Sequence, residues 1–122
     1  MYMKTTELDD FTRAYIECAL WSSTDDDSEP LDSNYSIEDI APDSLQKMIA
    51  DCQAFQKQNA GLLLPFDATS TGYDFWLTRN GHGCGFWDGD YPEEYGDPLT
   101  EACKEIGECD LYVGDDGQIY VS

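Results

Sequence analysis

The chain has 122 residues and carries 26 Asp and Glu against 6 Lys and Arg, which gives a formal net charge of -20. This balance argues against direct binding to nucleic acid or to an anionic membrane, because both partners need clustered basic side chains. Hydrophobic residues reach 41% and aromatic residues 13%, too many for an acidic disordered segment. We therefore expect a single folded domain over residues 1–122.

The first half of the sequence predicts two helices separated by an acidic loop. Residues 6–22 place apolar side chains at helical spacing. Residues 22–36 contain turn formers and acids without periodicity and predict a loop. Residues 42–59 predict the clearest helix, because Pro42 suits a first helical position and five apolar residues share one stripe. These five are Leu45, Met48, Ile49, Cys52 and Phe55.

Two short patterns predict how these helices begin. Thr6 and Asp9 form a weak capping pair at the start of the first helix. Ser36 and Asp39 have the same spacing and predict a short turn ahead of the second helix.

The second half of the sequence predicts two hairpins. Residues 73–78 are rich in aromatic side chains and predict a strand, and residues 84–87 predict the strand that returns beside it. Near the C-terminus, the apolar residues 111–113 and 118–121 flank residues 114–117, whose Asp-Gly pair is typical of a tight turn.

A second acidic loop and a short helix are predicted between the hairpins. The loop covers residues 88–97. Asp97 then serves as the helix cap, Pro98 takes the first helical position, and Gly107 ends the helix. Four side chains of this helix are expected to point inward, namely Leu99, Ala102, Cys103 and Ile106.

The predicted order is helix, helix, strand, strand, helix, strand, strand. Two hairpins without a βαβ pattern indicate an antiparallel sheet rather than a parallel one. The expected fold class is therefore α+β, a single domain with an antiparallel sheet of about four strands and two to three helices packed on one face.

The acidic residues are the main candidates for function, because a folded surface of this charge resembles nucleic acid to a basic protein. Such a DNA mimic would block the nucleic-acid-binding surface of its partner. Carboxylates at helical steps lie roughly 5–6 Å apart, which approaches phosphate spacing. The candidate partner-binding acids are Asp25, Asp26, Asp27, Glu29, Asp32, Asp88, Asp90, Glu93, Glu94, Asp97, Glu101, Glu105 and Glu108.

Other interpretations of the sequence remain open. The charge can instead serve solubility or adaptation to high salt. In that case a protein-binding adaptor or inhibitor could use a hairpin that carries Trp76, His82 and Trp87. His82 and Cys84 could also form the nucleophilic pair of a small hydrolase, although no third orienting residue or oxyanion motif accompanies them. We expect a protein without catalytic activity.

No cofactor or defined metal site is expected. The acidic runs at residues 25–27 and 88–90 could attract calcium or magnesium, but neither follows a calcium-loop pattern, since Pro92 and Glu93 interrupt the second. The five cysteines contain no Cys-x-x-Cys pair and predict buried, reduced thiols. No apolar stretch is long enough to span a membrane, and residues 1–10 lack a secretory pattern, so a cytoplasmic location is expected.

Several segments resemble one family of small acidic proteins encoded by phages and other mobile elements. The core run covers residues 74–88 and reads Asp-Phe-Trp-Leu-Thr-Arg-Asn-Gly-His-Gly-Cys-Gly-Phe-Trp-Asp. Residues 110–120 and the segment from Tyr15 to Thr24 also resemble that family. The resemblance covers most of the chain, except the loops near residues 25–35 and 61–72.

This resemblance implies a phage or mobile-element origin and expression in the cytoplasm of a bacterial host. It supplies context for a function rather than a mechanism. Phages use acidic DNA mimics against restriction enzymes, CRISPR effectors, DNA glycosylases and nucleoid proteins. The expected partner is therefore a basic nucleic-acid-binding host protein, which the acidic protein meets as a monomer or a homodimer.

Overall fold

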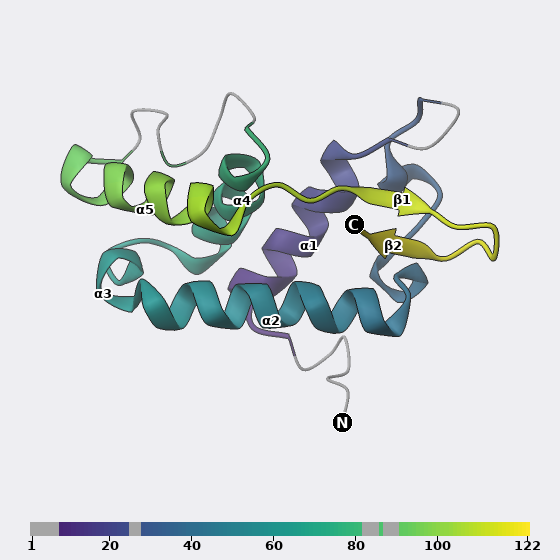
Figure 1. The fold of residues 1–122 in the computed structure, drawn as a ribbon, viewed down its shortest axis with the longest axis horizontal. Coiled ribbons are helices and arrows are strands. Elements are labelled where there is room, and N and C mark those ends of the chain that lie inside the picture. Colours follow the sequence, from purple (N-terminus) through teal and green to yellow (C-terminus); the bar gives the residue numbers. More distant parts are fainter. Residues whose placement is uncertain (1–7, 25–27, 82–85, 87–90) are drawn as a thin grey trace.

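The computed structural model describes residues 8–24, 28–81, 86 and 91–122, and this part of the chain is mostly helical (Figure 1). The α-helices are α1 (Asp10–Ser22), α2 (Pro42–Gln58), α3 (Ala60–Leu63), α4 (Ala68–Arg79) and α5 (Glu93–Ile106). The 3-10 helices are η2 (Leu31–Ser33) and η3 (Ile37–Asp39), and the strands are β1 (Leu111–Val113) and β2 (Ile119–Val121).

Both helices predicted in the first half are present, but the predicted start of the first is wrong, because α1 begins at Asp10 rather than at residue 6. The N-cap of α1 is Asp9, whose side chain accepts a hydrogen bond from the backbone N of Thr12 at 2.8 Å. Thr6, its predicted capping partner, lies outside the described residues. Pro42 opens α2, and all five residues of the predicted apolar stripe are buried. The predicted pair of Ser36 and Asp39 forms a capping box at η3.

The strand predicted at residues 73–78 is wrong, because these residues belong to helix α4. Their aromatic side chains favour a strand by propensity, but packing against α1 overrides that preference. Gly72 allows the two helices to approach closely, since a Cβ atom there would lie 2.2 Å from the carbonyl oxygen of Phe11. The buried side of α4 also includes Thr71 and Arg79, so its apolar residues alone do not show a helical stripe.

Helix α5 begins earlier than predicted, at Glu93 rather than after Asp97. Pro98 therefore lies inside the helix, and the last part of the predicted acidic loop forms the first turns of α5. Gly107 ends the helix as predicted, with a positive φ of 87° that suits glycine. Ile106 does not point inward, because it is 37% exposed.

The predicted sheet of about four strands is wrong, and with it the expected α+β fold of two to three helices on one face. In the described residues the sheet has two strands, because only the C-terminal hairpin forms as predicted. β1 pairs antiparallel with β2, and Tyr112 lies opposite Tyr120. The return strand predicted at residues 84–87 lies outside the described part of the chain except for Phe86, which is in a turn.

Aromatic side chains form the centre of the core. The rings of Phe55 and Phe75 stack with their centroids 4.1 Å apart, which joins α2 to α4. Tyr15 from α1 lies 5.0 Å from Phe75, and Phe86 stacks on Phe55 at 6.0 Å. Burial of these large rings supplies much of the hydrophobic free energy of folding.

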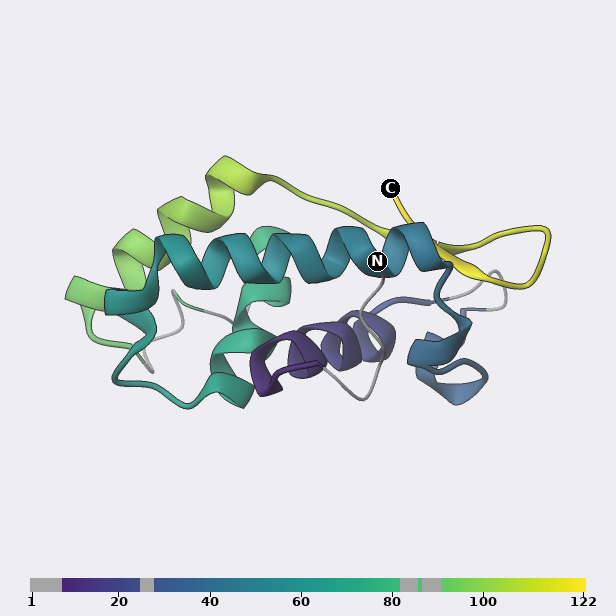
Figure 2. The same cartoon turned by 90° about the horizontal axis from the view of Figure 1, so that it is seen from below.

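The molecule is elongated along helix α2. In Figure 1, α3 and α5 lie at one end of the long helix α2, and the β1–β2 hairpin lies at the other end. Figure 2 shows α2 running along the molecule, with α1 on one side and α5 on the other.

A buried arginine connects four parts of the fold. The guanidinium of Arg79 donates hydrogen bonds to the hydroxyl of Tyr15, to the carboxylate of Asp51 and to the carbonyl of Gly107, each at 2.9 Å. It also lies 5.7 Å from the ring centroid of Phe75. Because the side chain of Arg79 is only 4% exposed, these contacts replace its hydration and fix the C-terminal end of α5.

Candidate functional site

Helix α5 gathers five of the predicted partner-binding acids on one side. These acids are Glu93, Glu94, Asp97, Glu101 and Glu105, and all five are exposed. At 100° per residue, their positions fall within an arc of about 120° around the helix axis. The buried residues of α5, Gly96, Leu99, Thr100 and Cys103, occupy a separate arc of about 100°. We call these five carboxylates the α5 stripe.

The α5 stripe has a charge density close to that of one DNA strand. At about 1.5 Å per residue, the stripe is roughly 18 Å long from Glu93 to Glu105. One strand of duplex DNA carries a phosphate every ~3.4 Å of its axis, which gives about five phosphates over this length. Lys104 lies within the same arc and contacts Glu101 at 3.4 Å, so its positive charge reduces the net charge of this side of α5 from five negative charges to four.

Three of the other predicted acids are described and lie outside the α5 stripe. Glu29 and Asp32 are exposed at η2, toward the hairpin end of the molecule, and the Glu29 carboxylate accepts a hydrogen bond from Asn34. Glu108 is exposed just beyond the end of α5. Asp25, Asp26, Asp27, Asp88 and Asp90 lie outside the described residues. The described acids of the first predicted loop therefore lie outside the stripe, whereas Glu93, Glu94 and Asp97 of the second predicted loop belong to it.

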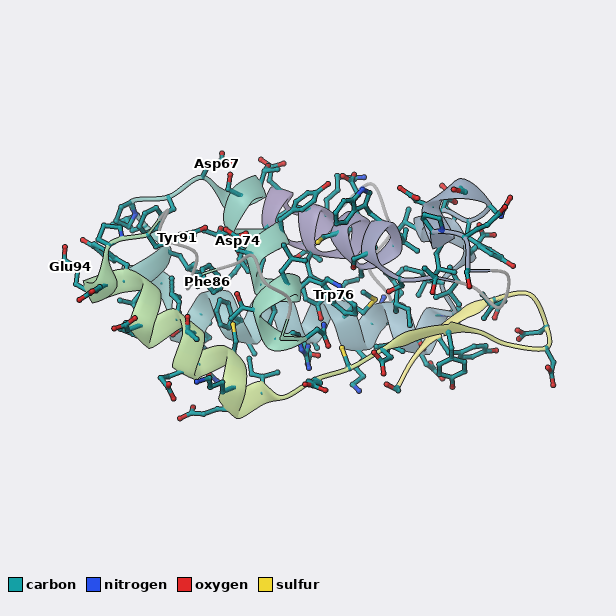
Figure 3. The ribbon with its side chains drawn as sticks, turned by 90° about the horizontal axis from the view of Figure 1, so that it is seen from above. Asp67, Asp74, Trp76, Phe86, Tyr91 and Glu94 are labelled. Atoms are coloured by element: carbon teal, nitrogen blue, oxygen red, sulfur yellow. The ribbon has the colours of Figure 1, made fainter. Side chains whose placement is uncertain are left out.

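A pocket that the sequence did not predict lies beside the first half of α4. It has a volume of about 480 Å³. Its lining consists of Phe66, Asp67, Thr69, Ser70, Tyr73, Asp74 and Tyr91. We call it the α4 pocket. Figure 3 shows Asp67, Asp74 and Tyr91 close to the N-terminal end of α5, where Glu94 lies.

Sequence patterns predict a loop at residues 61–72 and a strand at residues 73–78, and neither element would form this pocket. Asp67 carried the usable signal. It caps α4, and its side chain accepts a hydrogen bond from the backbone N of Ser70 at 3.1 Å. Asp is one of the preferred N-cap residues, so a helix that begins after Asp67 would have placed Tyr73 and Asp74 on adjacent helical positions.

The surroundings of the α4 pocket are strongly negative. Burial and then the charges of Glu17 and Asp32 raise the pKa of the Tyr73 hydroxyl. Burial and then the charge of Asp74 raise the pKa of the neighbouring Cys18 thiol to about 12. Asp74 in turn accepts a hydrogen bond from the hydroxyl of Tyr91. Negative charge from three elements therefore converges near this pocket.

The alternative sites suggested by the sequence receive no support from the described residues. Trp76 is 2% exposed and its indole N–H donates to the Ser22 hydroxyl at 2.8 Å, so the exposed Trp76 anchor expected on a hairpin is wrong. His82, Cys84 and Trp87 lie outside the described residues. Cys18, Cys52, Cys103 and Cys109 are buried free thiols, as predicted.

Metal ligands and membrane spans were sought in the same part of the chain. Within residues 8–24, 28–81, 86 and 91–122, no group of three or more His, Cys, Asp or Glu side chains is arranged to hold a metal ion. No helix among these residues is both long and apolar enough to cross a bilayer.

Comparisons with known proteins give no family for this chain. No protein-family model, no curated protein and no solved structure matches it. The class of protein that the fold defines is therefore a mostly helical acidic domain with a small C-terminal hairpin.

Proposed function

We propose that the protein is an acidic DNA mimic that blocks the nucleic-acid-binding surface of a basic host protein. The phage-protein resemblance of residues 74–88 supports a target in bacterial defence, such as a restriction or CRISPR enzyme. One observation carries the proposal: α5 holds five exposed carboxylates within an arc of about 120° along roughly 18 Å of helix.

The mechanism is electrostatic competition. A protein that binds DNA presents Lys and Arg side chains at phosphate spacing, and the α5 stripe offers carboxylates at a similar density. The net charge of -20 adds a long-range attraction that raises the association rate. Competition of this kind needs no catalytic residue and no cofactor.

The stripe is held rigidly enough to act as a preformed surface. Leu99 and Cys103 bury the opposite side of α5 in the core. Phe66 contacts Tyr95 near the start of the helix, with ring centroids 5.3 Å apart. The Arg79 bond to Gly107 fixes the other end. Binding therefore does not need to order the helix first, which would weaken affinity.

A capture experiment tests this function with two variants of equal charge. The stripe variant carries Glu93→Gln, Asp97→Asn, Glu101→Gln and Glu105→Gln. The control variant carries Asp10→Asn, Glu38→Gln, Asp110→Asn and Asp115→Asn, four exposed acids away from α5. Each immobilised protein is exposed to bacterial lysate, and retained proteins are eluted with duplex DNA or with salt.

The wild type and the control variant should retain the same nucleic-acid-binding protein and release it to DNA. The stripe variant should bind it between roughly fourfold and several-hundredfold more weakly, because four exposed ion pairs of about 0.2–1 kcal/mol each together contribute about 0.8–4 kcal/mol. Equal retention by both variants would show that total charge, rather than the stripe, determines binding. Retention that neither DNA nor salt reverses would contradict mimicry.

A further inference from the structure

The α4 pocket combines aromatic rings with carboxylates, which is the chemistry that recognises a guanidinium. Phe66, Tyr73 and Tyr91 supply the rings, and Asp67 and Asp74 supply the carboxylates. A guanidinium stacks on aromatic faces through cation–π attraction, and its planar fork of N–H groups donates two hydrogen bonds to carboxylate oxygens. None of the seven lining residues is Lys or Arg, so no side chain of the lining competes for that role.

The two carboxylates are held in place before any ligand binds. One oxygen of Asp67 accepts hydrogen bonds from the backbone N and the hydroxyl of Ser70, at 3.1 and 3.3 Å. The Asp74 carboxylate accepts a hydrogen bond from the Tyr91 hydroxyl. Fixed orientation reduces the entropy that binding has to remove.

The aromatic walls are also packed in fixed positions. The ring of Phe66 meets that of Tyr91 edge-on with centroids 4.8 Å apart. Tyr91 packs edge-on against the buried Phe86 at 5.2 Å. Phe66 also contacts Tyr95 of α5, which joins the pocket wall to the first turn of the helix that carries the α5 stripe.

We propose that the α4 pocket receives the guanidinium of an arginine from the partner's nucleic-acid-binding surface, an inference that rests on the proposed function. The arginine stacks between aromatic rings and bonds to Asp67 and Asp74, while the α5 stripe contacts neighbouring basic residues. The pocket then supplies a defined anchor, and the stripe supplies the general electrostatic attraction. Specificity for one basic protein over others then comes from this anchor rather than from the general electrostatic attraction.

Nuclear magnetic resonance titration tests the pocket without the partner. The probe is N-acetyl-L-arginine methylamide, which has a single positive charge, added to the isotope-labelled full chain. The matched neutral probe is the citrulline analogue, which keeps the shape of the side chain and lacks the charge. The lysine analogue tests whether a planar guanidinium is required or any cation suffices.

Amide shifts from the arginine probe should concentrate in residues 66–74 and at Tyr91, with half-saturation at about 1–10 mM. The citrulline probe should cause no saturable shifts, and the lysine probe should bind several-fold more weakly. Shifts scattered over the whole acidic surface would overturn the proposal, since they indicate non-specific electrostatic attraction of the probe. Equal binding of the citrulline probe would overturn it as well.

Three variants locate the binding. Asp74→Asn and Asp67→Asn should each weaken the arginine probe at least fivefold, while Asp115→Asn, at the far hairpin, should leave it unchanged. Asp67→Asn is the safer structural test, because Asn caps a helix about as well as Asp. If all three variants weaken the probe equally, the pocket is not the site.

Failure of this proposal and failure of the proposed function are distinguishable. If the arginine probe does not bind the pocket but the α5 stripe still captures a protein that DNA releases, the arginine anchor is wrong and DNA mimicry still holds. The four-substitution stripe variant should in turn keep its affinity for the arginine probe to within about twofold. Loss of the probe in that variant would place the arginine on the stripe instead of in the pocket.

Discussion

The close crossing of α1 and α4 at Gly72 gives the sharpest prediction about this fold. Replacing Gly72 with Ala adds a Cβ atom 2.2 Å from the Phe11 carbonyl oxygen, 2.9 Å from its carbonyl carbon and 3.1 Å from the Cβ of Ala14. The two nearest atoms belong to backbone, so they cannot turn aside as a side chain would. The helices must separate, and the contact between Phe11 and Phe75, at 5.8 Å, opens with them.

Two opposing terms set the magnitude of this effect. Ala is favoured over Gly inside a helix by about 1 kcal/mol. Overpacking of a dense interior costs about 1–3 kcal/mol and more where backbone has to move. Because the atoms that the new Cβ meets are backbone, we take an overpacking cost of about 3 kcal/mol or more. After the helix gain is subtracted, the expected net loss is about 2 kcal/mol or more in the free energy of unfolding, or roughly 8 °C in Tm for a domain of this size.

Urea unfolding followed by circular dichroism measures this loss, and Gly61→Ala is the matched control. Gly61 lies in α3 with no atom within 4 Å of its added Cβ, so the same substitution there should stabilise the protein by up to ~1 kcal/mol. The two variants should therefore shift the urea midpoint in opposite directions. A Gly72→Ala variant as stable as the wild type would refute the close helix crossing.

Three further results are expected. Asp51→Ala leaves the buried Arg79 guanidinium without its carboxylate, and because the Asp51 side chain is 28% exposed we expect a loss of about 2–3 kcal/mol in urea unfolding, below the 3–5 of fully buried pairs. Asp9→Ala removes the α1 cap and should cost about 1 kcal/mol at pH 7. Burial raises the pKa of Asp9, but hydrogen bonds from Thr12 and Gln56 lower it by more, so the pKa in the folded protein lies below 3.8. The stability difference between Asp9→Ala and wild type should therefore be complete above pH 3.8 and shrink as the pH falls through the folded pKa. An unchanged difference at pH 2 would contradict this. Burial raises the pKa of the Cys18 and Cys103 thiols to about 12, so labelling of these two by a disulfide reagent at pH 8 should follow global unfolding, and rapid labelling of either in the native protein would contradict their burial.

The sequence predicted the elements whose buried residues are apolar. The stripe from Leu45 to Phe55 showed the buried side of α2 directly, and the Asp-Gly turn at residues 116–117 showed the C-terminal hairpin. In both places local preference and tertiary packing agree. Such agreement makes secondary structure readable from one sequence.

Helix α4 could not be predicted from apolar periodicity because three of its buried positions are Thr71, Gly72 and Arg79. Arg79 is buried only because Asp51 and Tyr15, which are distant in the sequence, supply its hydrogen bonds. Gly72 is buried because α1 crosses there. Neither reason is visible in the residues near α4, so aromatic strand propensity gave the wrong result.

The candidate site was predicted in part. The helical steps of Asp97, Glu101, Glu105 and Glu108 predict one acidic stripe; the first three are exposed on α5, but Glu108 lies beyond the end of the helix. Glu93 and Glu94 were placed in a loop because Pro98 was taken as the start of the helix. The α4 pocket depends on contacts between residues 66–74 and Tyr91, which local patterns do not report.

The pairing of α1 with α4 determines when this protein can fold during synthesis. The main partner of α1 is α4, and residues 23–67 separate the two helices. At about 5–20 residues per second, the ribosome adds this intervening segment in roughly 2–9 s. During that interval the apolar side of α1, with Phe11 and Tyr15, has no α4 to cover it. The nascent chain is therefore most exposed to proteases and chaperones before its last third is made, and its acidic residues keep it dispersed meanwhile.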